Sequence, residues 1–149
     1  MKFSTEAVEK MAEVLTEELQ QAEVAGEGIW GIETKMREIL VAVGAKALGN
    51  YLEKQDEEEG EDTVVCGCGA GMKYLFKREA KILSVFGWVS YRRRYHSCSV
   101  CHAGQAPLDL RMRMEAGKVT AGLAELLALA HCLQVKHFRQ LSRSNFEAP

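Results

Sequence analysis

The sequence predicts an α+β protein: an N-terminal helical hairpin, a small zinc-ribbon-like antiparallel β module and C-terminal helices. Three observations predict this class. Apolar residues recur at helical spacing at both ends of the chain, alternating strand-like segments lie between them, and two close pairs of cysteines flank those segments. The chain has 149 residues, 47% of them hydrophobic and 27% charged, which is typical of one ordinary folded domain or two small ones.

Residues 1–53 form the predicted helical hairpin. Apolar residues recur every three or four positions from Val8 to Ala22, and again from Ile32 to Tyr51. Ser4 or Thr5 can act as the N-cap of the first helix, because a short hydroxyl side chain accepts a hydrogen bond from a first-turn N–H. Neither helix can bury its apolar stripe alone. We therefore expect packing within the chain, with homodimerisation through the same N-terminal helices as the alternative.

Residues 54–63, KQDEEEGEDT, contain no apolar side chain and predict a solvated acidic linker that separates two domains. A surface that mimics nucleic acid is the alternative. Residues 1–63 hold 6 Lys and Arg against 16 Asp and Glu, whereas residues 64–149 hold 13 against 5. The overall charge of −2 therefore combines an acidic half with a basic half, and the two halves are expected to meet different partners.

Two cysteine pairs, CGCG at 66–69 and CSVC at 98–101, lie within the predicted module at 64–112. Close pairs on either side of a strand-rich insert are the arrangement of a zinc ribbon, because Zn²⁺ takes four tetrahedral ligands from two turns. The ion would be structural, since protein fills all four positions. The alternatives are His96 or His102 replacing one cysteine, a disulfide, a redox pair, and unconnected thiols. The predicted ligands are Cys66, Cys68, Cys98 and Cys101.

The insert predicts strands at 72–78, 80–86 and 88–96, with Gly87 in a hairpin turn. The last strand alternates, so that Val89 and Tyr91 share one face while Trp88 and Arg92 share the other. Arginine beside tyrosine and tryptophan suits contact with phosphates and bases, so we expect nucleic acid as a partner. Only Glu79 opposes seven cations, which are Lys73, Lys77, Arg78, Lys81, Arg92, Arg93 and Arg94.

Residues 113–149 predict helical structure, with helices at 118–133 and 135–142. A tight break between two helices is the arrangement of a helix-turn-helix, which would present Lys136, Arg139 and Arg143. The alternative is a pair of ordinary core helices. Cys132 lies within the first of these helices and is interpreted as a buried small apolar residue.

Several motifs together resemble the N-terminal region of ISKra-type insertion-sequence transposases. They are CGCG at 66–69, the run from Lys81 to Cys101 with Phe86-Gly87 and C-x-x-C, and Gly104-x-x-Pro107-Leu108-Asp109. The match covers residues 64–112, and His102 stands where the family often has glycine. The resemblance implies the DNA-recognition part of a transposase. We expect the catalytic domain to be missing, because the acidic residues after position 64 are too scattered to form a metal-binding triad.

We therefore expect a non-catalytic zinc-binding and nucleic-acid-binding protein. The alternative is a small interaction protein that inhibits or regulates a transposase or a host-defence nuclease through its acidic half. No apolar run approaches the ~20 residues that span a bilayer, and the N-terminus has no signal-peptide core. The expected location is the cytoplasm, with no membrane partner.

Overall fold

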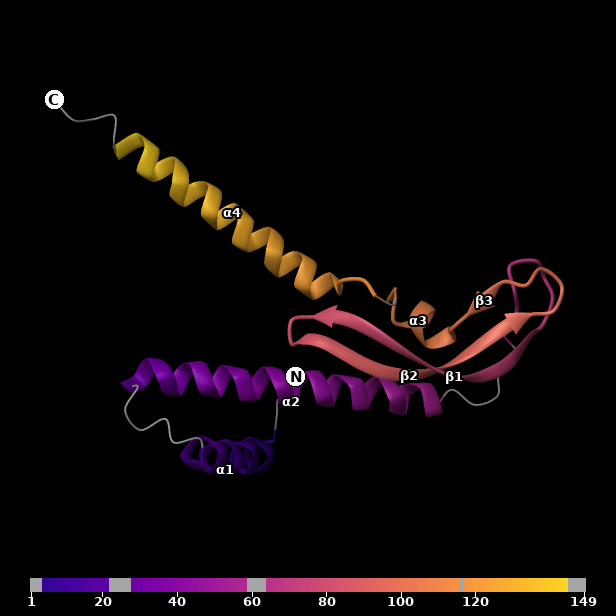
Figure 1. Ribbon diagram of the computed structural model, residues 1–149, viewed down its shortest axis with the longest axis horizontal. Coiled ribbons are helices and arrows are strands. Elements are labelled where there is room, and N and C mark those ends of the chain that lie inside the picture. Colours follow the sequence, from indigo (N-terminus) through magenta and orange to yellow (C-terminus); the bar gives the residue numbers. More distant parts are fainter. Residues whose placement is uncertain (1–3, 22–27, 59–63, 116, 145–149) are drawn as a thin grey trace. The chain divides into compact units, whose positions relative to one another are not determined.

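The computed structural model describes residues 4–21, 28–58, 64–115 and 117–144, with side chains as far as Cys132. The β-strands form one antiparallel sheet in the order β1-β2-β3, so the predicted α+β class is confirmed. None of the described helices combines the length and apolar character that crossing a bilayer requires. The elements in chain order are α1 (Thr5–Gln21), α2 (Gly28–Glu58), β1 (Met72–Ser84), β2 (Gly87–Cys98), β3 (Gly104–Gln105), α3 (Pro107–Arg111) and α4 (Ala121–Ser144) (Figure 1).

The chain divides into two compact units between Gly44 and Ala45, within α2. In the first unit, α1 begins as predicted: the Ala7 N–H donates to Ser4 Oγ at 3.2 Å, which makes Ser4 the N-cap. None of the residues of α1 is buried. The packing of a helical hairpin therefore stays a prediction, and the connection between α1 and α2, residues 22–27, lies outside the described residues.

The prediction of an acidic linker at 54–63 is wrong for residues 54–58. Helix α2 continues through Glu58, and the Asp56 side chain is fully buried. The charge run does not end the helix because it contains no glycine or proline before position 60, and because Asp56 gains hydrogen-bond partners on the sheet. Residues 59–63 lie outside the described part. The predicted domain boundary also moves, since the last turns of α2 pack on β-structure of the second unit.

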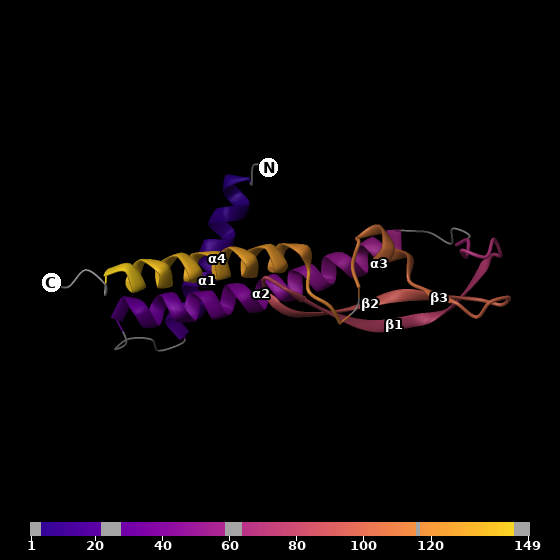
Figure 2. The same cartoon turned by 90° about the horizontal axis from the view of Figure 1, so that it is seen from above.

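Strands β1 and β2 form one long ribbon, with β3 at the end that carries the cysteine turns (Figures 1 and 2). The break expected at residues 78–80 is absent, and β1 runs without interruption from Met72 to Ser84. Charged residues there do not end the strand, because every pair of that stretch remains in the ladder. The irregularity lies instead between Tyr74 and Phe76, where the register shifts. The predicted turn at Gly87 is confirmed, with φ +80°.

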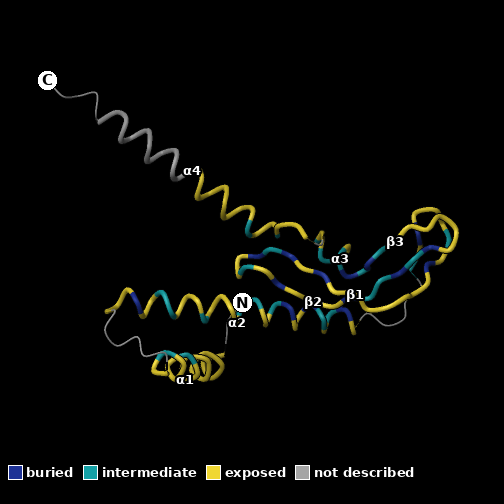
Figure 3. Tube along the Cα trace, viewed as in Figure 1, coloured by how far each residue is buried: buried dark blue, intermediate teal, exposed yellow. Residues whose placement is uncertain are grey.

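The main core of the second unit lies on one face of the β1–β2 ribbon. Val89 and Tyr91 point into it and are each 1% exposed, while Trp88 and Arg92 are exposed on the opposite face. The predicted alternation is therefore confirmed over this stretch. Figure 3 shows that β1 and β2 carry both buried and exposed positions. Helices α2 and α3 contribute to the same core. The buried members are Leu52, Ala80, Ile82, Val89, Tyr91 and Leu108.

Helix α4 begins after Thr120, whose Oγ1 accepts the Leu123 N–H at 3.3 Å. It continues without a break to Ser144, so the expected pair of helices, and with it the helix-turn-helix, is wrong. No glycine or proline stands near position 134 to end the first helix. Cys132 is exposed, not buried, and no residue is buried between Ala121 and Cys132. The side chains of Lys136, Arg139 and Arg143 lie outside the described residues.

Candidate metal centre

Two turns of similar geometry carry the cysteine pairs. In the first, the Cys66 N–H donates to Ala70 O at 2.9 Å and the Gly69 N–H donates to Cys66 O at 2.8 Å. In the second, the Cys98 N–H donates to Ala103 O at 2.9 Å. The residue that follows the second cysteine is left-handed in both turns, with φ +86° at Gly69 and +60° at His102. His102 therefore occupies a backbone position that favours glycine.

The ladder brings the two turns together. Met72 at the start of β1 pairs with Cys98 at the end of β2, so the segments before and after the ribbon meet at one end. Cys66, Met72 and Cys98 are buried together in a small cluster that is separate from the main core. Cys68 and Cys101 are exposed. The candidate site thus lies at the surface of the second unit, with two exposed cysteines and two cysteines buried against Met72.

The four predicted ligands converge. Their Sγ atoms all lie within 4.8 Å of one another, with 3.4 Å between Cys66 and Cys101 and 3.6 Å between Cys68 and Cys98. Four sulfurs around one tetrahedral ion, with metal–sulfur bonds of about 2.3 Å, lie about 3.8 Å apart. These separations are also far longer than the ~2.05 Å of a disulfide. The site therefore has the size of a four-coordinate metal centre, and it could hold a metal ion.

The backbone prepares one of these sulfurs to act as a ligand. The N–H groups of Cys101 and Val100 point at Cys98 Sγ and lower the pKa of that thiol to about 6. The Val100 nitrogen lies 3.4 Å from the sulfur. Because metals bind the thiolate, this shift favours metal binding at neutral pH. His96 and His102 are not members of the candidate ligand cluster found among the described residues.

The structure divides the seven predicted nucleic-acid cations into two groups. Three of them form ion pairs: Arg93 with Asp109 and Arg94 with Asp56 inside the fold, and Lys77 with Glu57 at the exposed surface. Lys73, Arg78, Lys81 and Arg92 are exposed on the ribbon. Arg78 lies over the Tyr95 ring, with 5.4 Å from its guanidinium carbon to the ring centroid.

Asp109 joins helix α3 to the ribbon, a function that the sequence motif alone did not indicate. Its Oδ2 accepts Arg93 Nε at 2.6 Å and its Oδ1 accepts the Tyr91 hydroxyl at 3.0 Å. The Arg93 and Asp109 side chains are only 7% and 13% exposed. Burial, and next the Asp109 carboxylate, raise the pKa of Tyr91. Arg93 is therefore a structural residue that holds α3 on the ribbon through its ion pair with Asp109.

Carboxylates of α2 cover the open edge of β2, which sequence patterns also did not indicate. Glu53 Oε1 accepts the Arg92 N–H at 2.9 Å, and the Asp56 carboxylate accepts the Arg94 N–H at 3.0 and 3.1 Å. A Cβ built on Gly49 would lie 2.7 Å from Ser90 O, so the helix approaches the strand closely at this glycine. Because β3 pairs only with His96 and Ser97, α2 serves as the neighbour of β2 at residues 90–94.

The Gly104-x-x-Pro107-Leu108-Asp109 motif has a structural explanation at each position. A Cβ at Gly104 would overlap the Tyr95 hydroxyl, so the ring packs directly on this backbone. Pro107 begins α3, where its missing N–H removes no helical hydrogen bond. Leu108 is fully buried in the main core. The motif therefore fixes the chain that follows the metal centre onto the ribbon.

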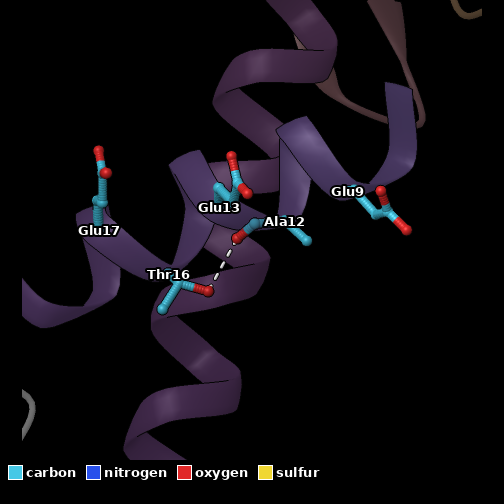
Figure 4. A pocket seen from close by; sticks show the side chains of 5 residues that line it. All are labelled: Glu9, Ala12, Glu13, Thr16 and Glu17. Carbon is cyan, nitrogen blue, oxygen red and sulfur yellow. Dashed lines mark hydrogen bonds between the residues drawn. The ribbon is translucent and has the colours of Figure 1, made fainter. Parts of the chain in front are cut away.

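Two other hollows offer less chemistry. Figure 4 shows a shallow hollow along α1, lined by Glu9, Ala12, Glu13, Thr16 and Glu17. It belongs to a single helix, and the Thr16 hydroxyl already donates to Ala12 O at 2.8 Å. A second hollow, of about 450 Å³, lies in the second unit between α2, β1 and the segment 112–122. Its lining is largely apolar, with Leu48, Ile82 and Met114 among the contributing residues.

No protein-family model, curated protein or solved structure matches the chain. The function is therefore argued from the site itself, and the resemblance in residues 64–112 contributes only to the proposal.

Proposed function

We propose that this protein is a non-catalytic nucleic-acid-binding module held together by a structural zinc ion. The observation that carries the proposal is the convergence of four cysteine sulfurs at the end of a cationic, aromatic β-ribbon. Four protein ligands leave no open coordination position for water or substrate, so the ion would contribute folding free energy and no chemistry.

Zinc is the ion that the donor set favours. Four thiolates at tetrahedral spacing suit Zn²⁺ or an iron–sulfur centre, and closed four-cysteine sites on paired turns are typical of structural zinc. Protein purified without added metal should contain about one zinc per chain. A chelator should lower the Tm of the wild type, and Cys98→Ser should abolish zinc retention. Cys132→Ser is the matched control, because that exposed thiol lies outside the cluster. Metal-free protein with the same Tm would contradict the proposal.

Nucleic acid is the partner that the remaining charges favour. The exposed cations of the ribbon suit phosphates, and neutralised phosphates release counterions, so affinity should fall steeply as salt rises. Lys81→Ala or Arg92→Ala should weaken binding to any sequence and reduce the salt slope by about one each. Lys10→Ala on the acidic helix α1 is the control and should leave affinity unchanged. Flat salt dependence would contradict electrostatic binding.

DNA is the favoured nucleic acid because residues 64–112 resemble the recognition part of transposases. The acidic half supports a second candidate function, the regulation of a nucleic-acid enzyme through protein contact. The observation that favours it is the exposure of apolar residues on α1, with Val8 52%, Met11 66% and Val14 54% exposed. Such a surface also suits homodimerisation, which light scattering would detect. Tight binding to a transposase or nuclease together with no affinity for nucleic acid would favour the second candidate.

A further inference from the structure

We propose that the ribbon binds single-stranded nucleic acid on its open face, with unpaired bases stacked on Trp88 and Tyr74. This inference rests on the proposed function and names its substrate class. The open face is the side of the β1–β2 ribbon opposite the main core, and we define it by Tyr74, Lys77, Glu79, Lys81, Trp88, Ser90 and Arg92.

The register assigns these residues to one face. Val89 and Tyr91 point into the core, so Trp88, Ser90 and Arg92 point the other way. Residues directly opposite each other in an antiparallel ladder share a face, which adds Lys81 opposite Ser90 and Glu79 opposite Arg92. Tyr74 lies opposite His96 on the same face, with ring centroids 5.8 Å apart.

Two exposed aromatic rings lie near the two ends of this face. Trp88 is 59% exposed and Tyr74 is 52% exposed. Tyr74 pairs with His96, which stands eight positions after Trp88 on β2, so the rings are separated by about 26 Å along the strands. An aromatic ring on a sheet surface stacks well on an unpaired base, and that contact tolerates any base. A strand of several nucleotides would connect the two rings.

Cations lie between the two rings. Lys77, Lys81 and Arg92 contribute three positive charges, whereas Glu79 is the acid on the face itself. Lys77 is paired with Glu57 at 3.0 Å, but both side chains are well exposed, and exposed pairs contribute little, so a phosphate can replace the carboxylate. The face is therefore complementary to one phosphate backbone that runs along the strands.

A duplex fits this face poorly. Bases in a duplex are stacked on one another, so their flat surfaces cannot reach Trp88 or Tyr74. A two-stranded ribbon reads the full base code of a duplex by entering the major groove, which is about 12 Å wide. Helix α2 lies along the β2 edge at Gly49 and Glu53. The two strands lie about 5 Å apart and the helix beside them is about 10 Å across, so their combined width exceeds the width of the major groove.

The test uses the full-length zinc-loaded protein with the Trp30→Phe change, which leaves Trp88 as the only tryptophan. A 20-nucleotide single-stranded DNA of mixed sequence should quench the fluorescence of Trp88. It should also bind at least tenfold more tightly than the duplex of the same sequence. Trp88→Leu and Tyr74→Leu should each weaken single-strand binding by about tenfold, the effect of losing one stacked base. The matched control compares the wild type with Trp30→Phe, and the two should bind the single strand equally, since Trp30 is an exposed tryptophan on α2 outside the ribbon.

Each outcome decides between the claims. Duplex binding as tight as single-strand binding, or unchanged affinity in both leucine variants, would overturn the single-strand inference and leave the proposed function standing. Binding to neither form would overturn the proposed function as well. Zinc content and Tm are measured for every variant to verify that each one is folded and zinc-loaded. Both should equal those of the parent protein, because Trp88 and Tyr74 are exposed.

Discussion

Replacing Asp109 by alanine should destabilise the second unit more than any change to an exposed ion pair. The carboxylate accepts hydrogen bonds from both Arg93 and Tyr91, at 2.6 and 3.0 Å. Its removal leaves the Arg93 guanidinium, 7% exposed, without its carboxylate partner inside the protein. Breaking a buried pair in this way costs about 3–5 kcal/mol. The small remaining exposure of both side chains places the expected loss near the lower end of that range.

Urea unfolding of the zinc-loaded protein measures this loss. With an m-value of about 2 kcal/mol/M, a loss of about 3 kcal/mol lowers the urea midpoint by about 1.5 M. The control is Glu115→Ala, which removes the partner of Lys118 in an exposed pair, with 69% and 70% of the two side chains exposed. That change should leave the urea midpoint almost unchanged, because exposed ion pairs contribute little to stability.

A double substitution separates the ion pair from simple loss of packing. Arg93→Met combined with Asp109→Leu replaces the buried charges by apolar side chains, and it should be less destabilising than the sum of the single changes. If Asp109→Ala costs no more than Glu115→Ala, or if the double variant equals the sum of its parts, the pair does not join α3 to the ribbon as we describe.

Three further predictions concern the metal centre and its support. His102→Gly should raise the free energy of unfolding by up to about 1 kcal/mol, because φ is +60° there, and a higher Tm checks it. Gly104→Ala should lower the free energy of unfolding by about 1–3 kcal/mol, since the new methyl overlaps the Tyr95 hydroxyl, whereas Gly67→Ala, which meets open space, should not. In metal-free, reduced protein, the lowered pKa of Cys98 should make stability increase as pH rises from about 6 toward the ordinary thiol value near 8.5, because the unfolded chain then binds more protons. Urea midpoints across this pH range should lose that slope in Cys98→Ser.

Local features of this fold could be predicted from the sequence because their causes are local. Ser4 caps α1 through a hydrogen bond to a residue only three positions away. The alternation of Val89 and Tyr91 with Trp88 and Arg92 follows from the two-residue period of a strand. The two turns of the metal centre carry their own glycine or left-handed position beside each cysteine pair.

Element lengths were harder to predict because packing decides them. The acidic residues at the end of α2 favour solvent when considered alone, and a linker was expected there. Asp56 is nevertheless buried, because β2 presents backbone N–H groups that would otherwise be left open along its edge. For the same reason β1 continues through the charged residues at which a break was expected. The residues before and after that point all remain paired with β2.

The sequence by itself determined the four candidate metal ligands and the cationic, aromatic character of the ribbon, because residue type and spacing suffice for both. Only the tertiary structure decided which cations support the fold and which face solvent. Arg93 and Arg94 meet carboxylates 16 and 38 positions away, and no periodic pattern relates residues at those separations. Arg92, between Tyr91 and Arg93 in the chain, points to the opposite face from Arg93. Long-range pairing in the folded chain therefore separates neighbouring arginines into structural residues and residues exposed to solvent.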